Sequence, residues 1–211
     1  MHVIIVLNIN QIKSKMIKIF FVVAVIAITG SACNSGNNTS EKDEKNTDTT
    51  VNNTSSTKLS NNSDSKVDAS MKEMVSQYLQ IKNALANDNG KDAASGGKAF
   101  VESMGKMDKN SLTGDKKKKW DDVSDDAKEM AEHISTNADK IDHQREHFDM
   151  LSTDMYEMVK TFGGAQTLYQ DFCPMYNHNK GATWLSETKE IKNPYMGKKQ
   201  PTCGSLKEEI K

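Results

Sequence analysis

The sequence predicts an all-α fold, a four-helix up-and-down bundle with an irregular C-terminal tail packed on it. Apolar residues recur at three- and four-residue steps in four consecutive segments, and no strand pattern precedes the tail. About 145 residues follow Lys66, enough for one domain with a single core. The net charge is −1, and two aspartates lie close behind the basic run Lys116–Lys119, so we expect no nucleic-acid partner.

Residues 1–33 have the layout of a secretory signal peptide. Basic residues precede an apolar run from Ile19 to Ile28, and small residues lead to Cys33. The run is about ten residues long, whereas a membrane-spanning helix needs about 20, so we expect export and cleavage. The segment resembles a bacterial lipoprotein cleavage site, although Gly30 stands where that pattern prefers a large aliphatic residue. We therefore expect a periplasmic or cell-surface lipoprotein anchored to a membrane through Cys33; the alternative is a soluble exported protein.

Residues 34–66 are expected to be a disordered linker. Asn, Ser, Thr, Asp, Lys and Glu dominate this stretch, and Val51 and Leu59 are its only larger apolar residues. Such a segment cannot bury enough apolar surface to offset the entropy lost on ordering. The folded part is therefore expected to be one helical domain from residue 67 to residue 211.

The helical period is clear in the first two thirds of that domain. The expected helices cover residues 67–85, 91–107, 116–136 and 138–162. Glycines at 90, 114 and 163 separate or end them. Many methionines lie on the apolar stripes, where a flexible thioether fills gaps in a core. Those expected in the core are Met71, Met74, Met104, Met130, Met155 and Met158.

The tail gathers sulfur outside any helical period. Cys173 and Met175 are followed within about thirty residues by Met196 and Cys203. Soft sulfur ligands select copper(I) and similar ions, so the tail is a candidate copper site. Trp184 and Leu185 are expected to pack the tail onto the bundle.

Two histidines add imidazole ligands to these candidates. His143 and His147 are four residues apart in the fourth expected helix, which places them on one face about one turn apart. Such a pair can bind copper(II) or zinc, although a helix face that is merely polar explains it as well. His133, in the third helix, joins them only if the bundle brings it across. His178 looks like a turn residue.

A disulfide between Cys173 and Cys203 is the alternative to a metal site in the tail. It would close a loop of about thirty residues and stabilise an irregular segment by roughly 3 kcal/mol. The two interpretations stay open, because reduced thiols bind metal and oxidised ones do not. We do not expect an enzyme, because the Cys-Pro-Met segment offers no evident oxyanion donors for a cysteine nucleophile.

Several runs of the sequence carry a resemblance to a known family. They are Tyr78-Leu79-Gln80-Ile81-Lys82-Asn83-Ala84-Leu85, Asp142-His143-Gln144-Arg145-Glu146-His147-Phe148, and the tail motifs Cys173-Pro174-Met175, Lys180-Gly181-Ala182-Thr183-Trp184-Leu185-Ser186, Asn193-Pro194-Tyr195 and Thr202-Cys203-Gly204. With these runs, residues 67–211 resemble the family of unknown function numbered 3347. Gln200 departs from the family pattern, which has a methionine there.

The resemblance implies an exported bacterial protein, free-standing or joined to the periplasmic adaptor of a heavy-metal efflux pump. Together, the residues and the resemblance favour a lipoprotein that binds a soft metal, copper above all, as an accessory in heavy-metal homeostasis or efflux. The expected partners are a metal ion, an efflux adaptor and the membrane. The expected ligands are Cys173, Met175, Cys203, His143, His147 and Met196. The alternative is a disulfide-stapled structural or protein-interaction module without metal.

Overall fold

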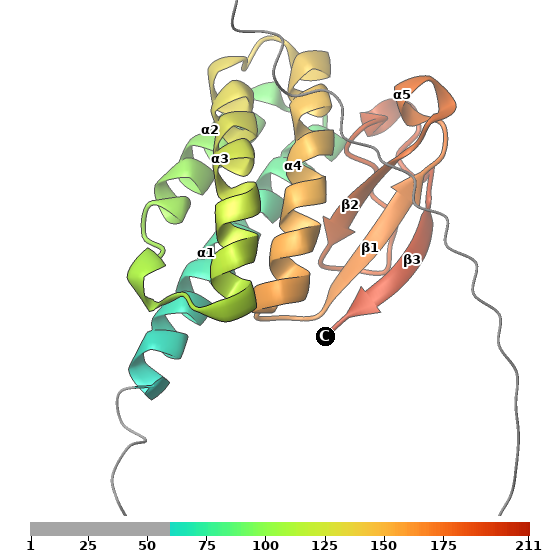
Figure 1. Cartoon of the computed structure of the whole chain (residues 1–211). Coiled ribbons are helices and arrows are strands. Elements are labelled where there is room, and N and C mark those ends of the chain that lie inside the picture. The colour runs from blue at the N-terminus through green and yellow to red at the C-terminus, as the bar shows by residue number, and fades with distance from the viewer. Residues whose placement is uncertain (1–59) are drawn as a thin grey trace, which may run out of the picture. The chain divides into compact units, whose positions relative to one another are not determined.

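The computed structural model of the protein describes residues 60–211, which form four long helices followed by a small antiparallel sheet (Figure 1). The helices are α1 (Ser60–Ala86), α2 (Gly90–Met104), α3 (Gly114–Thr136) and α4 (Ile141–Phe162), and a short 3-10 helix, η1 (Lys109–Ser111), lies between α2 and α3. The tail contains β1 (Leu168–Cys173), the single-turn α5 (Tyr176–Asn179), β2 (Ala182–Ser186), the 3-10 turn η2 (Gly197–Lys199) and β3 (Ser205–Ile210). This part of the chain is mostly helical, as predicted.

The helix boundaries follow local signals in the sequence. The Asn89 side chain caps α2 by accepting the N–H of Asp92 at 3.1 Å. Gly163 ends α4 with a φ of 90°, a conformation that favours glycine, and its N–H donates to the Val159 carbonyl. Helix α1 begins at Ser60, within the range predicted as linker. The predicted signal peptide, the lipidation site Cys33 and most of the predicted linker lie outside the described residues.

Successive helices pack against one another, and α1 also contacts α4. Their apolar stripes meet in one core that includes Tyr78, Phe100, Trp120 and Phe148. Of the methionines predicted for this core, the fully buried ones are Met71, Met74, Met104, Met155 and Met158. Met130 is only partly buried, so that prediction was wrong in part. The up-and-down order of the helices stays a prediction.

The prediction of an irregular tail was wrong, because residues 168–210 contain a three-stranded antiparallel sheet with the order β2-β1-β3. Tyr169 of β1 pairs with Ser186 of β2 and with Glu209 of β3, and an irregularity in register follows at Gln170 and Asp171. The strands have five or six residues each, and β3 consists mainly of polar residues. These short strands lack the clean apolar alternation that marks a strand in sequence.

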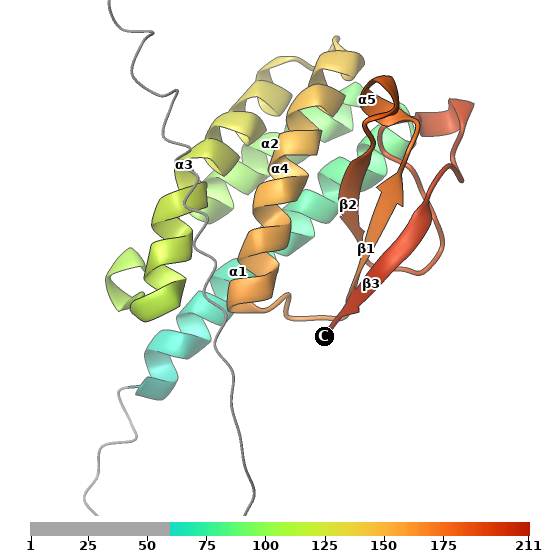
Figure 2. The ribbon, with the colours of Figure 1, turned by 45° about the vertical axis from the view of Figure 1, so that its right-hand side comes forward.

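The sheet packs on α4 and α1, so α4 lies between the sheet and α3 (Figures 1 and 2). Trp184 and Leu185 of β2 are 1% exposed, which confirms that they pack the tail onto the helices. The N–H of Leu185 donates to the Tyr78 hydroxyl of α1 at 3.0 Å, and that hydroxyl lies 2.8 Å from Ser152 Oγ of α4. The polar groups between sheet and helices are therefore tied to both layers.

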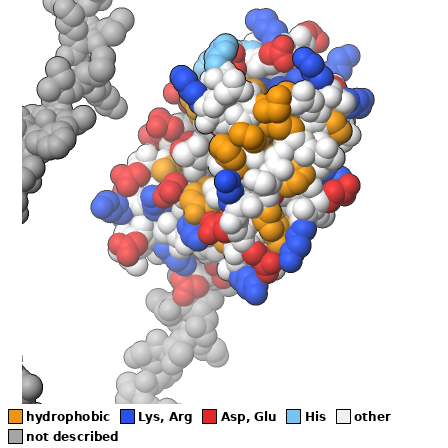
Figure 3. Space-filling view, turned by 90° about the vertical axis from the view of Figure 1, so that its right-hand side faces the viewer, with side chains coloured by type: hydrophobic (Ala, Val, Ile, Leu, Met, Phe, Trp, Pro, Cys, Tyr) orange, Lys and Arg blue, Asp and Glu red, His pale blue; other side chains and the backbone are white. Residues whose placement is uncertain are grey.

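The opposite face of the sheet carries hydrophobic side chains between lysines and acidic residues (Figure 3). Tyr169 and Phe172 alternate with buried residues of β1, and Lys189 and Lys207 lie over their rings at 5.5 and 4.6 Å. Leu206 of β3 is 43% exposed. The lysine stems cover part of the aromatic surface while their charges stay in water.

None of the helices in residues 60–211 combines the length and the apolar composition needed to cross a membrane.

Candidate metal centre

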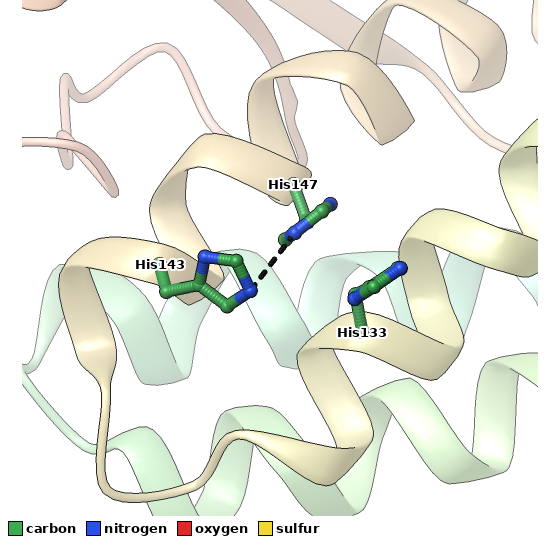
Figure 4. A group of neighbouring side chains, drawn as sticks. All are labelled: His133, His143 and His147. Carbon is green, nitrogen blue, oxygen red and sulfur yellow. Dashed lines mark hydrogen bonds between the residues drawn. The ribbon is translucent and has the colours of Figure 1, made fainter. Parts of the chain in front are cut away.

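Three histidines converge where α3 ends and α4 begins (Figure 4). His133 comes from the last turn of α3, and His143 and His147 come from the first two turns of α4. One ligand atom from each ring lies within 4.8 Å of the others. Among the histidine, cysteine and carboxylate side chains of the described residues, these three histidines form a group whose ligand atoms are close enough together to hold one metal ion.

The hairpin between α3 and α4 produces this convergence. Helix α3 ends at Thr136 and α4 begins at Ile141, so the two helices fold back on each other after a short connection. His133 and His143 lie at similar distances on either side of that connection, which places them opposite each other. His147 follows His143 by about one helical turn and stacks on His133, with ring centroids 4.2 Å apart and planes 4° from parallel.

The closest approach is between His143 Nε2 and His147 Nε2, at 3.1 Å. Two imidazole nitrogens this close need one proton or one cation between them, because two lone pairs or two N–H groups would repel. Ligand nitrogens around a tetrahedral zinc ion, with bonds of about 2.0 Å, are about 3.3 Å apart. The pair is therefore already spaced for a shared ion.

The second nitrogen of each ring also has a partner. His143 Nδ1 is 3.4 Å from Glu146 Oε2, and His147 Nδ1 is 3.3 Å from the thioether sulfur of Met130. His133 Nε2 is 3.8 Å from Glu129 Oε1. Of these contacts only the one to Met130 has hydrogen-bond geometry, and a proton held on His147 Nδ1 leaves Nε2 with its lone pair for a metal.

The electrostatics favour the neutral form of His147. Burial, together with the neighbouring rings of His133 and His143, lowers the pKa of His147 below its usual value. A metal binds only the deprotonated ring, so a lowered pKa leaves His147 free to ligate at neutral pH. The cluster is nevertheless accessible, because the side chains of His133 and His143 are 43% and 39% exposed.

An acidic cavity of about 460 Å³ lies beside the cluster. Its lining includes the carboxylates of Asp142, Glu146 and Asp149, and Glu146 also contacts His143. Arg145 lies in the same wall, but its guanidinium is already paired with Asp88 and Asp142 and bonded to the Pro194 carbonyl at 2.9 Å. None of the three histidines lines this cavity, which adjoins the tail, and Glu146 is the residue that the cavity and the histidine group share.

The structure divides the ligands predicted from sequence between two places. His143 and His147 join His133, whereas Cys173 and Cys203 meet each other in the sheet, with their sulfurs 3.0 Å apart. Neither cysteine is part of the histidine group, because that group faces α3 and the sheet packs on another side of α4.

The two methionines of the tail are not in contact with the histidine group either. Met175 is 51% exposed at the start of α5, and Met196 is partly buried against the core at the start of η2. His178 is exposed in the turn of α5 with a φ of 57°, as expected of a turn residue. In the described part of the tail, the two cysteines therefore lie next to each other, and His178 is not a ligand beside them.

Comparison with known proteins gives one family match. Residues 74–167 match the model of a family described as "Protein of unknown function (DUF3347)". The match supports a family of unknown function; it covers the second half of α1, all of α2, α3 and α4, and the three histidines, and it ends before β1. No curated protein and no solved structure matches the chain.

Sequence reasoning missed part of the histidine cluster. It included His133 only on condition that the bundle brought it across, it placed Met130 in the core, and it did not identify Glu129 or Glu146. The signal was the spacing, because Glu129 lies one turn before His133 and Glu146 lies within one turn after His143. A glutamate about one helical turn from a histidine lies on the same helix face and can contact its ring, and this spacing can be read from the sequence.

Proposed function

We propose that the domain binds a transition-metal ion, copper in preference, through His133, His143 and His147. The convergence of three imidazoles within 4.8 Å carries this proposal. Imidazole nitrogen suits copper, zinc and nickel, and among the divalent ions a given nitrogen site binds copper(II) most tightly. The three ligands leave a further coordination position, which faces partly exposed surface and allows the ion to exchange.

A purely structural role explains the cluster less well. Buried polar groups that stabilise a fold are paired with groups of opposite polarity. Here two bases face each other at 3.1 Å, and the third stacks on one of them, so without an ion the rings restrict one another's protonation. A shared proton satisfies the 3.1 Å pair in the empty protein, and a cation can take the place of that proton.

The cellular part of the proposal extends to export and membrane attachment. We propose a lipoprotein anchored through Cys33 that buffers copper or delivers it to a heavy-metal efflux adaptor, acting as a binding protein and not as an enzyme. The signal-peptide layout of residues 1–33 and the family resemblance support this role. The acidic cavity beside the histidines supports uptake of a cation from solution.

A competition titration tests the proposal. The metal-free protein is titrated with copper(II), zinc(II) and nickel(II) beside two variants, His147→Ala and His178→Ala. We expect one equivalent of copper to bind, with nitrogen couplings from imidazole in the electron paramagnetic resonance spectrum. His147→Ala should lower the affinity at least 100-fold, whereas His178→Ala, which removes an exposed histidine from the tail, should not change it.

Wild-type protein that binds copper no more tightly than His147→Ala would refute the histidine site. The remaining function would then be a structural or protein-interaction module.

A further inference from the structure

The two cysteines of the folded domain meet at one end of the sheet. Cys173 is the last residue of β1, and Cys203 lies two residues before the start of β3. Because β1 and β3 are paired, with Phe172 opposite Ser205, the chains run side by side at this point. The sulfurs are 3.0 Å apart, and Cys173 is fully buried while Cys203 is partly exposed.

Backbone contacts hold Cys203 in this place. Its carbonyl accepts the side-chain N–H of Asn193, and its own N–H donates to the Gln200 carbonyl at 3.2 Å. Gly204 follows with a φ of 149°, and a Cβ there would lie 2.9 Å from the Trp184 ring. The sheet and the connection between β2 and β3, residues 187–204, therefore fix the sulfurs as neighbours without any further movement of the chain.

We propose that Cys173 and Cys203 form an intramolecular disulfide, made by exchange with an external disulfide, that fastens the 187–204 connection to β1. The accessible Cys203 thiolate attacks the external disulfide, releases one thiol and forms a mixed disulfide. The Cys173 thiolate then attacks Cys203 Sγ and releases the second thiol. Two cysteine thiols are oxidised and one external disulfide is reduced to two thiols, and the two cysteine protons pass to solvent and the departing thiolates.

The disulfide adds a covalent link to a segment that is otherwise held by polar contacts and by the buried side chains of Asn193 and Tyr195. In residues 187–204 the only regular element is the single turn η2. The Pro194 carbonyl accepts from Arg145 Nε, and the Lys198 N–H donates to Asp88 Oδ2 at 3.1 Å. A covalent link at Cys203 closes a loop around β2 and most of this connection, which removes conformational freedom from the unfolded chain.

The disulfide also explains why the cysteines and the histidines, which are both potential metal ligands, lie in separate places. Once oxidised, neither cysteine can ligate a soft ion, so the tail has a structural role and the histidines remain for metal. This inference does not depend on the proposed metal site, because thiol content and metal affinity are measured separately.

Thiol labelling and melting of the chain test the inference. A Cys33→Ser variant leaves Cys173 and Cys203 as the only thiols. After incubation with oxidised glutathione, we expect its intact mass to fall by two hydrogen atoms, alkylation to be lost at both positions, and a cross-linked peptide to contain both cysteines. Reduction should lower the melting temperature by about 10 °C and increase hydrogen exchange in residues 187–204.

Reduction needs no change in sequence, so the result does not depend on whether a variant at the buried Cys173 folds. Cys203→Ser, at the more exposed position, should melt like the reduced protein and should not respond to the reductant. Two thiols that stay open to alkylation after oxidation would overturn the inference. An unchanged melting temperature on reduction, or protection of the thiols by a soft metal ion alone, would overturn it as well.

Discussion

Two polar clusters of the domain differ in how their charges are compensated. Between α1 and the sheet, Lys82 is fully buried and lies 2.8 Å from Glu187 Oε2, while Asn83 donates to the other oxygen of Glu187. At the α3–α4 hairpin, His133 and His143 are 43% and 39% exposed and face another base. The first cluster is closed by its own partners, whereas the second brings together three imidazoles, two of which share one proton or one cation between Nε2 atoms 3.1 Å apart.

The difference separates a structural group from a candidate site. Burial with internal pairing stabilises a fold and leaves nothing for a ligand. Like groups that converge at an accessible surface do not stabilise the fold in this way until a ligand binds to them. The comparison predicts that variants of the Lys82 cluster will change stability, and that variants around the histidines will change metal affinity with little effect on the free energy of unfolding.

The largest effect is expected at Lys82. Lys82→Ala should lower the free energy of unfolding by about 3–5 kcal/mol, because it opens a cavity and leaves the Glu187 carboxylate without its charged partner. Lys82→Met keeps most of the volume and should cost less. Lys119→Ala is a matched control, since Lys119 and Glu157 form an ion pair at 2.6 Å with both side chains partly exposed.

Urea unfolding of the three variants provides the measurement. The Lys119 control should change stability by less than about 1 kcal/mol. Equal losses for Lys82→Ala and Lys119→Ala would show that the buried pair contributes no more than a surface pair, and the structural half of the comparison would fail.

A second effect, dependent on pH, is expected at Asp171 in the same layer. Its carboxylate is fully buried with neither oxygen bonded, and burial raises its pKa to about 7, partly opposed by Lys82. The folded state therefore holds this proton more tightly than the unfolded state. Stability from this group is fully present below pH of about 4 and is lost as the pH rises toward 7.

Asp171→Asn removes this titration. Relative to wild type, the variant should gain stability as the pH rises from 4 to 7, by about 1–3 kcal/mol at pH 8. Denaturant unfolding at a series of pH values measures the difference. Parallel pH profiles for wild type and variant would show that Asp171 is ionised in the folded protein.

Much of the helical part was predictable because its residues follow a 3.6-residue period over long segments. Glycines at 90, 114 and 163 mark the helix boundaries, and the buried seam of α4 includes Gln144, Phe148 and Leu151. The sheet was not predictable in the same way. Asp171 is buried in β1 although aspartate is seldom buried, and four of the six residues of β3 are polar. Its strands are specified by packing on α4 more than by their own pattern.

The candidate site was predictable only in part for a related reason. Spacing of four residues places His143 and His147 on one face of a helix whatever the tertiary fold is. His133 enters through the contact between two helices, which local periodicity does not report. The chemistry of the cysteines was enough to identify them as candidates. Their distance from the histidines along the sequence does not indicate which side of α4 each group occupies.

A third and smaller effect is expected at Glu146. Glu146→Gln keeps the shape of the side chain and removes the carboxylate that lies 3.4 Å from His143 Nδ1. Copper affinity should fall about tenfold, because partners of this kind raise the basicity of a ligating imidazole. Glu190→Gln, at an acidic residue of the tail paired with Lys192, is the matched control.

Isothermal titration with copper(II) measures both variants, and thermal melting checks that each is folded. A loss of unfolding free energy at Glu146→Gln, without a change in copper affinity, would assign the Glu146 contact to the fold and not to the site.

The smallest effect is expected at Met130. Met130→Leu replaces a thioether with an alkyl group of similar volume, so the free energy of unfolding should change by less than about 1.5 kcal/mol. The sulfur lies 3.3 Å from His147 Nδ1, the nitrogen directed away from His143. It therefore acts as a weak acceptor that orients the ring, and its loss should lower copper affinity less than tenfold. Met150→Leu, at an exposed methionine of α4, should have no effect. A loss at Met130 greater than that of Glu146→Gln would instead make the sulfur a ligand, and His147 would then turn its Nδ1 toward the metal.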